Sequence, residues 1–261
     1  MSFRNRFRTF SIFSIILSVI LQSVFFGGAV FAASPSLSLD LQPNEFGVFP
    51  VLEYHRVGSK EDRWTRSYEN FRSDLKWLYS NNYRAVSIKD YFEQKISIPA
   101  GKKPVIFTFD DGNDSQIQLN AFAEVMPNTA VFIMDEFLKV HPDFGSSAVF
   151  YINRNFFSAS PDRFAVLKYL EKTGREVQQH TATHVDLSKI SASQVEGELS
   201  WLGNIFQEAG LTMHQISIAY PFGGVPTAEN FSALQKYAKI GFLVGADPAR
   251  MPYDPKFDAH H

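Results

Sequence analysis

The sequence contains no cysteine. This absence excludes disulfide bonds, thiolate catalysis and cysteine-ligated zinc sites, but it does not fix the compartment, because exported proteins often have no disulfides. A surplus of positive charge is also absent, since 25 Lys and Arg residues stand against 27 Asp and Glu residues. Nucleic-acid phosphates are bound by basic surfaces, so nucleic acid is not expected as a partner.

The amino terminus has the features of a targeting segment. Its first eight residues include three arginines and no acid, and an apolar run follows from Phe10 to about Phe31, before small residues. This pattern predicts a signal peptide over residues 1–33, with cleavage before Ala33. An uncleaved anchor is the alternative, because the run is long enough to span a bilayer. Either interpretation predicts an exported protein: periplasmic, extracellular or on the outer face of the membrane.

Residues 34–46 are rich in Ser, Leu, Pro and Asn and are interpreted as a linker. In residues 47–261, strand-like and helix-like segments alternate, which predicts a single α/β domain with a parallel sheet and crossover helices. The chemistry of such barrels lies at the carboxyl ends of the strands. The predicted strands are residues 48–54, 84–88, 104–109, 147–152, 176–179, 215–219 and 241–245. The predicted helices are residues 67–80, 90–93, 120–140, 162–173, 193–208 and 227–237.

Two of the predicted helices rest on specific local signals. Ser193 and Glu196 fit a capping box at the start of the helix at residues 193–208. The segment at residues 120–140 is mostly helical in pattern but is interrupted at Pro127.

Asp110 and Asp111 directly follow the most apolar predicted strand, at residues 104–109. Charged side chains beside a buried strand must be paired or bind a metal. Neighbouring residues that leave a strand point in different directions, so the two carboxylates can have different roles. The alternative is an ordinary Asp-Asp-Gly turn, in which these residue types serve the backbone conformation.

His180 and His184 follow the predicted strand at residues 176–179 and have the spacing of metal ligands. On a helix both imidazoles would share one face, although two threonines between them favour an irregular turn. The alternative is one structural and one solvated histidine. With Asp111, the histidines predict an open divalent-metal site, most consistent with Zn²⁺. Asp110 would accept a proton from metal-bound water, which would act as the nucleophile.

The motifs resemble those of the polysaccharide deacetylases, the NodB-homology family that includes carbohydrate esterase family 4. Residues 108–112 (Thr-Phe-Asp-Asp-Gly), 180–184 (His-Thr-Ala-Thr-His) and 220–223 (Tyr-Pro-Phe-Gly) are similar to its first three motifs. The resemblance extends over about residues 49–245 and implies a distorted (β/α)7 barrel that removes N-acetyl, or sometimes O-acetyl, groups from sugars. By this resemblance the site residues are Asp110 as the base, Asp111, His180 and His184 as the ligands of a divalent metal, and Phe222 as a backbone donor to the oxyanion.

The sequence also departs from the family pattern. The stretch between Gly112 and Ala148 is longer than in compact family members and is expected to form an extra helix or a lid beside the cleft. Ala219 stands where the family has an arginine that orients the base, and Phe222 replaces a tyrosine. The family's carboxyl-terminal Leu-x-His motif, which carries the catalytic acid, is not evident before residue 261. Either the sequence is truncated near its end or the acid comes from another segment.

The segment Glu-Tyr-His-Arg at residues 53–56 offers such an acid. It resembles the amino-terminal segment of circularly permuted family members that act on poly-N-acetylglucosamine. By this resemblance His55 would protonate the leaving amine, and Arg56 would take over part of the role of the missing arginine. The alternative is that His55 is a hydrogen-bonding histidine at a strand end.

The predicted function is removal of N-acetyl groups from a cell-envelope or extracellular polysaccharide or oligosaccharide. Trp64, in a loop after the first strand, is the best aromatic candidate for substrate contact, and Tyr220 and Pro221 are further candidates. One alternative is a catalytically weak carbohydrate-binding relative with the same fold. Another is a hydrolase of a different small amide or imide.

Overall fold

A long buried strand lies at the centre of the structure, a computed structural model that describes residues 47–259. Strand β6 (Lys103–Asp111) has nine residues and is buried along almost its whole length. Burial on both faces explains its unbroken apolar run. The predicted targeting segment and linker, and His260 and His261, lie outside the described residues.

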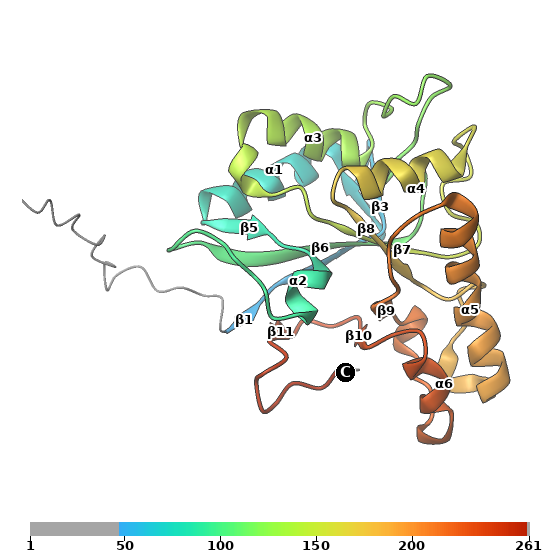
Figure 1. Ribbon diagram of the computed structural model, residues 1–261. Coiled ribbons are helices and arrows are strands. Elements are labelled where there is room, and N and C mark those ends of the chain that lie inside the picture. The colour runs from blue at the N-terminus through green and yellow to red at the C-terminus, as the bar shows by residue number, and fades with distance from the viewer. Residues whose placement is uncertain (1–46, 260–261) are drawn as a thin grey trace, which may run out of the picture. The chain divides into compact units, whose positions relative to one another are not determined.

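The strands form one parallel sheet with the order β10-β9-β8-β7-β6-β2, and β5 also pairs with β6 (Figure 1). The sheet is a curled half-barrel, because within residues 47–259 no pairing joins the edge strands β2 and β10. The predicted α/β barrel-type fold is therefore confirmed. The sheet strands are β2 (Val51–Tyr54), β5 (Tyr83–Ala85), β6, β7 (Val149–Ile152), β8 (Glu176–Gln179), β9 (Ser217–Ala219) and β10 (Ile240–Phe242). Two smaller pairs are β1 (Val48–Phe49) with β11 (Ala249–Arg250), and β3 (Arg56–Gly58) with β4 (Thr65–Ser67).

Helices α1, α3, α4 and α5 pack along the outer side of this sheet (Figure 1). No helix within the described part of the chain is both long and apolar enough to cross a membrane. The α-helices are α1 (Tyr68–Ser80), α2 (Ile88–Phe92), α3 (Ala130–Val140), α4 (Arg163–Lys172), α5 (Ala192–Ala209) and α6 (Phe231–Gln235). Short 3-10 helices are Pro142–Phe144, Leu187–Lys189, Pro221–Gly223 and Ala228–Asn230.

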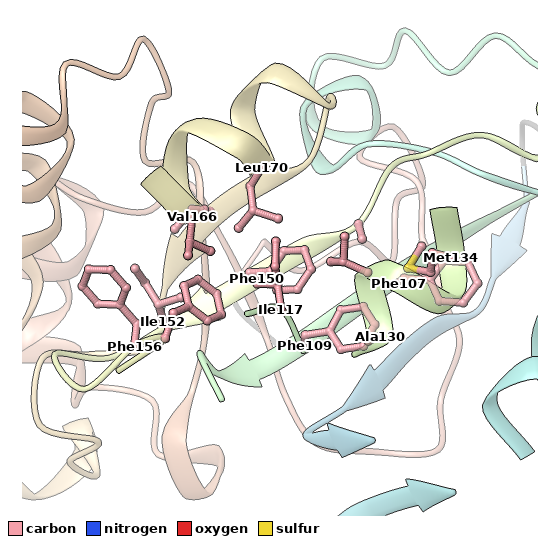
Figure 2. Packing of buried hydrophobic residues seen from close by; sticks show 14 of the residues in the cluster. Phe107, Phe109, Ile117, Ala130, Met134, Phe150, Ile152, Phe156, Val166 and Leu170 are labelled. Atoms are coloured by element: carbon pink, nitrogen blue, oxygen red, sulfur yellow. The ribbon is translucent and has the colours of Figure 1, made fainter. Parts of the chain in front are cut away.

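The alternation of side chains along β6 separates the core from the interior of the half-barrel. Phe107 and Phe109 point to the helices and pack with Phe150 of β7 in the main core (Figure 2). Because successive strand residues face opposite sides, Ile106 lies on the inner face. The same alternation brings Asp110 to the inner face, at the carboxyl end of the strand.

The predicted helix at residues 120–140 is wrong over its first half. Only α3 is helical, and Thr129 caps it by accepting a hydrogen bond from the Phe132 N–H. The Asn120 side chain accepts hydrogen bonds from the Phe122 and Glu124 N–H groups, which stabilises a turn instead of a helix. Helix α3 packs against α1, so it belongs to the outer helix layer and is not a lid.

Helix α5 begins earlier than the sequence pattern predicted. Its N-cap is Ser191, whose backbone N–H donates to Gln194 Oε1 at 3.0 Å, so the capping box is not Ser193 with Glu196. Both pairs have the required spacing, and the sequence pattern alone does not distinguish them. The helix predicted at residues 227–237 is also shorter, because only a 3-10 turn and α6 form there.

Two glycines of α5 test how backbone conformation contributes to stability. Gly197 is exposed inside the helix, and a Cβ there would meet nothing within 4 Å. We expect Gly197→Ala to raise the free energy of unfolding by about 0.5–1 kcal/mol, because alanine restricts the unfolded chain more than glycine. Urea denaturation measures this change.

The matched control is Gly210→Ala at the end of the same helix. A Cβ at Gly210 would also have open space, but its φ of 68° lies in the left-handed region. We expect the substitution to lower the free energy of unfolding by about 1 kcal/mol. Changes of the same sign at both positions would contradict this explanation.

Candidate functional site

The candidate residues meet at the carboxyl edge of the sheet, where β2, β6, β8 and β9 end. Asp110 and Asp111 are the last two residues of β6, so they belong to the strand and do not follow it. His180 directly follows β8, and His55 directly follows β2. The parallel register brings together residues that are far apart in the sequence.

Asp111, His180 and His184 form a compact cluster. Asp111 Oδ1 lies 3.5 Å from His180 Nε2 and 3.4 Å from His184 Nε2. One ligand atom from each of the three residues lies within 4.8 Å of the other two. The three predicted ligands are therefore close enough to bind one ion.

The segment between the two histidines is an irregular turn, as its threonines suggested. Thr181 and His184 have positive φ values of 59° and 56°, which non-glycine residues rarely adopt. Glu198 of α5 holds the turn, because its carboxylate accepts hydrogen bonds from the Thr183 N–H and hydroxyl. Such strained backbone persists where surrounding contacts enforce it, and it is frequent at functional sites.

The hydrogen bond of His180 defines which of its nitrogens is available. Its Nδ1 lies 2.8 Å from the Ala219 carbonyl oxygen, which can only accept a hydrogen bond, so Nδ1 carries the proton. The lone pair of the neutral ring then lies on Nε2, which is buried and has no hydrogen-bond partner within residues 47–259. This nitrogen faces the carboxylate of Asp111, so a cation or a proton must lie between the two acceptors.

The donor set fits a divalent metal ion. Two imidazole nitrogens and one carboxylate oxygen form a three-ligand set that leaves coordination positions open, which is typical of catalytic zinc sites. The hydrogen bond from His180 to a carbonyl is the outer contact that orients a histidine ligand. The structure thus supports a candidate metal site at Asp111, His180 and His184 without identifying the metal.

Charge coupling within the cluster shifts the pKa values of its members. Burial acts to lower the pKa of His180, but the charge of Asp110 and the contact with Asp111 outweigh burial and raise it. Burial acts to raise the pKa of Asp111, but the contact with His180 outweighs this and lowers it. Burial and the neighbouring His180 lower the pKa of His184. In the absence of a metal, these shifts favour a proton on His180 over one on Asp111.

Asp110 lies beside this cluster in a different environment. It is only 4% exposed, and its Oδ1 has no hydrogen-bond partner in the described part of the chain. Burial raises the pKa of Asp110 to about 7, against the opposing effect of His180. A carboxyl group with a pKa near neutrality can accept a proton at neutral pH.

Arg56 does not replace the family arginine that is missing at Ala219. Its guanidinium is exposed, donates to Thr65 Oγ1 at 3.1 Å and lies 3.8 Å from Asp62. The expectation that Arg56 takes over part of the role of that arginine is therefore wrong. The inner side of Asp110 and Ala219 instead borders a cavity of about 890 Å³ between β2 and the segment that contains β10.

His55 directly follows β2, which pairs with β6 on the side opposite β7, so His55 and the metal-ligand cluster lie on opposite sides of Asp110. Its Nδ1 is 3.4 Å from Glu53 Oε1, and one ligand atom each of Glu53, His55 and Asp110 lie within 4.8 Å of one another. Burial lowers the pKa of His55, although the charge of Glu53 opposes this. The ring of Trp64 packs over His55 with centroids 4.7 Å apart.

The loop after β9 presents Phe222 to the cluster. Phe222 has a φ of 58°, and among the described residues its N–H makes no hydrogen bond. Its side chain is 74% exposed, and the ring centroid lies 4.8 Å from that of His184. Tyr220 and Pro221 are buried, which favours a packing role, and their contact with substrate remains a prediction.

Three residues of the site escaped the sequence interpretation. Glu53 could have been found, because residues two apart on a strand share a face and it precedes His55. Gln116 is fully buried, and its Nε2 donates to the carbonyl oxygens of His55 and Asp110, which ties together the ends of β2 and β6. Neither Gln116 nor Glu198 carries a sequence signal for these contacts.

The fold and the cluster together define a class of protein: parallel α/β barrels with a candidate metal site at the carboxyl ends of the strands. Residues 97–244 match the family model described as polysaccharide deacetylase. This match covers more than half of the 261 residues, and the chain belongs to that family.

Individual proteins are similar to this chain in sequence or in fold. YxkH of Bacillus subtilis (strain 168), whose name as a polysaccharide deacetylase is itself a prediction, is 24% identical over 202 residues. The match covers 75% of this chain and 63% of that protein. The Streptococcus pyogenes deacetylase PplD, solved in complex with acetate, has a TM-score of 0.62 at 21% identity. The match covers 78% of this chain and 86% of the PplD chain. IcaB from Ammonifex degensii has a TM-score of 0.61 at 21% identity, with coverages of 80% and 89%.

The raised pKa of Asp110 predicts how the stability of the metal-free protein depends on pH. Because the folded pKa of about 7 exceeds the ordinary value of 3.8, the folded state binds more protons between these values. Stability from this group therefore falls as pH rises towards 7 and then levels off. In EDTA, the stability gained by Asp110→Asn should be larger at pH 8 than at pH 5, as measured by urea denaturation.

Asp143→Asn is the matched control, because contacts with Tyr79 and Arg84 lower the pKa of Asp143. Asp143 is ionised in both states at pH 5 and pH 8, so its effect on stability should not change between them. An equal effect of Asp110→Asn at the two pH values would show that Asp110 is ionised in the folded protein.

Proposed function

We propose that this protein is a metal-dependent hydrolase that removes N-acetyl groups from a cell-envelope or extracellular polysaccharide. The observation that carries the proposal is the Asp111–His180–His184 cluster with the buried, unpartnered Oδ1 of Asp110 beside it. Membership of the polysaccharide deacetylase family supports the same substrate class. The targeting pattern at residues 1–33 supports action outside the cytoplasm.

Asp111, His180 and His184 would hold the metal, and Zn²⁺ suits two imidazoles and one carboxylate. When bound, a divalent ion supplies Lewis-acid polarisation of the acetamide carbonyl and a lowered pKa for water. The hydrogen bond from His180 Nδ1 to the Ala219 carbonyl keeps the other ring nitrogen directed towards Asp111. The contacts of Glu198 with Thr183 fix the turn that carries His184.

Asp110 would accept the proton from the attacking water. Its two oxygens have different surroundings, because Oδ2 lies 4.0 Å from His180 Nε2 whereas Oδ1 has no partner in the described structure. The free Oδ1 is available as a proton acceptor. Burial keeps its pKa near 7, which matches a base that works at neutral pH.

The backbone N–H of Phe222 and the imidazole of His55 would complete the reaction. An unpaired N–H next to the cluster can donate to the oxyanion of the tetrahedral intermediate. His55 would protonate the leaving amine, and Glu53, 3.4 Å from its Nδ1, would orient the ring. The exposed rings of Trp64 and Phe222 offer apolar faces for sugar units next to these groups.

A catalytically weak carbohydrate-binding relative is the second candidate. It is favoured by Ala219, because no cation contacts Asp110 Oδ1 in residues 47–259. Base catalysis depends on a correctly oriented carboxylate, and the packing around Asp110 alone would have to provide that orientation. Acetate release from N-acetylglucosamine oligomers distinguishes an enzyme from a protein that only binds them.

Asp110→Asn and His184→Ala separate metal binding from proton transfer. We expect Asp110→Asn to keep about one equivalent of metal and to lose acetate release by roughly 10²–10⁴-fold, the usual contribution of a general base. His184→Ala should lose both metal and activity, because it removes one of three ligands. Metal analysis of the purified variants and an acetate assay measure these outcomes. Full acetate release by Asp110→Asn would refute its role as the base.

The role of His55 is tested with two leaving groups. An amine must be protonated to leave, whereas 4-nitrophenolate leaves without a proton. His55→Ala should therefore lower kcat for an N-acetylated oligosaccharide by about 10²–10⁴-fold, and should lower hydrolysis of 4-nitrophenyl acetate much less. His214→Ala, which removes an exposed histidine, is the control and should change neither rate. Equal losses on both substrates would contradict the acid role.

A further inference from the structure

A second pocket lies on the outer layer of the molecule, between the start of α4 and the middle of α5. Its volume is about 390 Å³, and none of its residues belongs to the candidate site described above. The pocket is lined by Arg154, Phe156, Arg163, Trp201, Asn204 and Ile205.

The two arginines of this pocket have no carboxylate partner. Neither Arg154 nor Arg163 forms an ion pair with any residue between 47 and 259. Most of the other arginines in that range do form one. Arg163 donates from Nη1 to the Arg154 carbonyl oxygen at 3.2 Å, which holds the two residues together. Two arginines without a carboxylate partner line this one pocket, which makes an oxyanion the favoured occupant, because arginine binds carboxylate and phosphate through paired hydrogen bonds.

Aromatic rings form the floor of the pocket. Phe156 and Trp201 are buried, with ring centroids 6.3 Å apart, and Phe156 also packs at the end of the main core next to Ile152 (Figure 2). The Arg163 guanidinium lies over the Phe156 ring, 4.6 Å from its centroid. Because Phe156 is fully buried and Trp201 is only 7% exposed, the rings support the pocket from below. The exposed side chains of Arg154, Arg163 and Asn204 supply the polar groups that would contact a sugar unit.

The walls of the pocket are attached to the segment that carries the candidate metal ligands. The Arg154 N–H donates to the carbonyl oxygen of Ala182, which lies between the two histidines, at 3.0 Å. Trp201 Nε1 donates at 3.1 Å to Gln179 Oε1, and Gln179 directly precedes His180. Arg154 also follows β7, whose carboxyl end belongs to the same edge of the sheet as the candidate site. A polymer bound at the cluster can therefore extend towards this pocket along one edge.

We propose that this pocket binds an oxyanion-bearing sugar unit of the substrate, with its carboxylate or phosphate paired to Arg154 and Arg163. The substrate is then an anionic glycan, and the pocket selects it over a neutral one. This inference rests on the proposed function only in taking a glycan as the substrate. The lactyl carboxylate of an N-acetylmuramic acid unit and a sugar phosphate are two sources of the same chemistry.

The experiment measures binding separately from turnover. Titration calorimetry compares three probes: N-acetylglucosamine tetramer, a tetrasaccharide of alternating N-acetylglucosamine and N-acetylmuramic acid, and N-acetylglucosamine 6-phosphate. The variants are Arg154→Gln, Arg163→Gln and the double variant. Lys168→Gln is the matched control, because Lys168 is an exposed cation on the same helix but outside the pocket. Acetate release from the neutral tetramer is measured in parallel.

We expect the double variant to weaken binding of at least one anionic probe by 10-fold or more, and binding of the neutral tetramer by less than 2-fold. Whichever anionic probe responds identifies the source of the oxyanion. Lys168→Gln should leave all affinities unchanged. Unchanged anionic binding in the double variant, or an equal loss for neutral and anionic probes, would overturn the inference. Absence of acetate release with an intact difference in binding would refute the proposed function and leave the anionic pocket standing.

Discussion

Two hydrogen-bond acceptors face each other at the carboxyl edge of the sheet, and this contact constrains the rest of the site. His180 Nε2 lies 3.5 Å from Asp111 Oδ1, and the Ala219 carbonyl holds the ring so that Nε2 cannot turn away. A lone pair and a carboxylate at this distance repel each other unless a positive charge lies between them. A proton on His180 would meet this requirement in the metal-free protein, and the charge of Asp110 together with the contact with Asp111 raises the pKa of His180 despite burial. A divalent ion would meet it better, because His184 adds a third ligand.

The sheet creates this constraint through simple geometry. Alternation along β6 brings Asp110 to the inner face, where burial raises its pKa, while Asp111, the last residue of the strand, turns with a φ of 74° towards the histidines. Two adjacent residues of one type thereby acquire different chemistry. The outer helices are packed against the opposite face of the same strand, so the core fixes the position of the site.

The sequence predicted those parts that local patterns determine. Apolar runs located the strands, and the positions of Asp110 and His180 at strand ends predicted their meeting, because parallel strands end at one edge. Local patterns failed where two motifs have the same spacing, as at the two overlapping capping boxes of α5. They also failed where a side-chain hydrogen bond to the backbone competes with a helix, as in the turn stabilised by Asn120. The pairing of β3 with β4 brings Arg56 to Thr65 and away from Asp110, and this contact leaves no local pattern in the sequence. Hydrogen bonds between distant segments, such as those of Gln116, leave no local pattern.

The central claim is that Asp111, His180 and His184 bind one metal ion together. X-ray absorption spectroscopy at the zinc edge of the zinc-loaded protein tests it most directly. The account predicts two imidazole nitrogens at about 2.0–2.1 Å and at least one oxygen at about 2.0–2.2 Å, and no such zinc signal in His184→Ala, which should not retain the metal. A spectrum with oxygen ligands only, or one that His184→Ala leaves unchanged, would contradict the account.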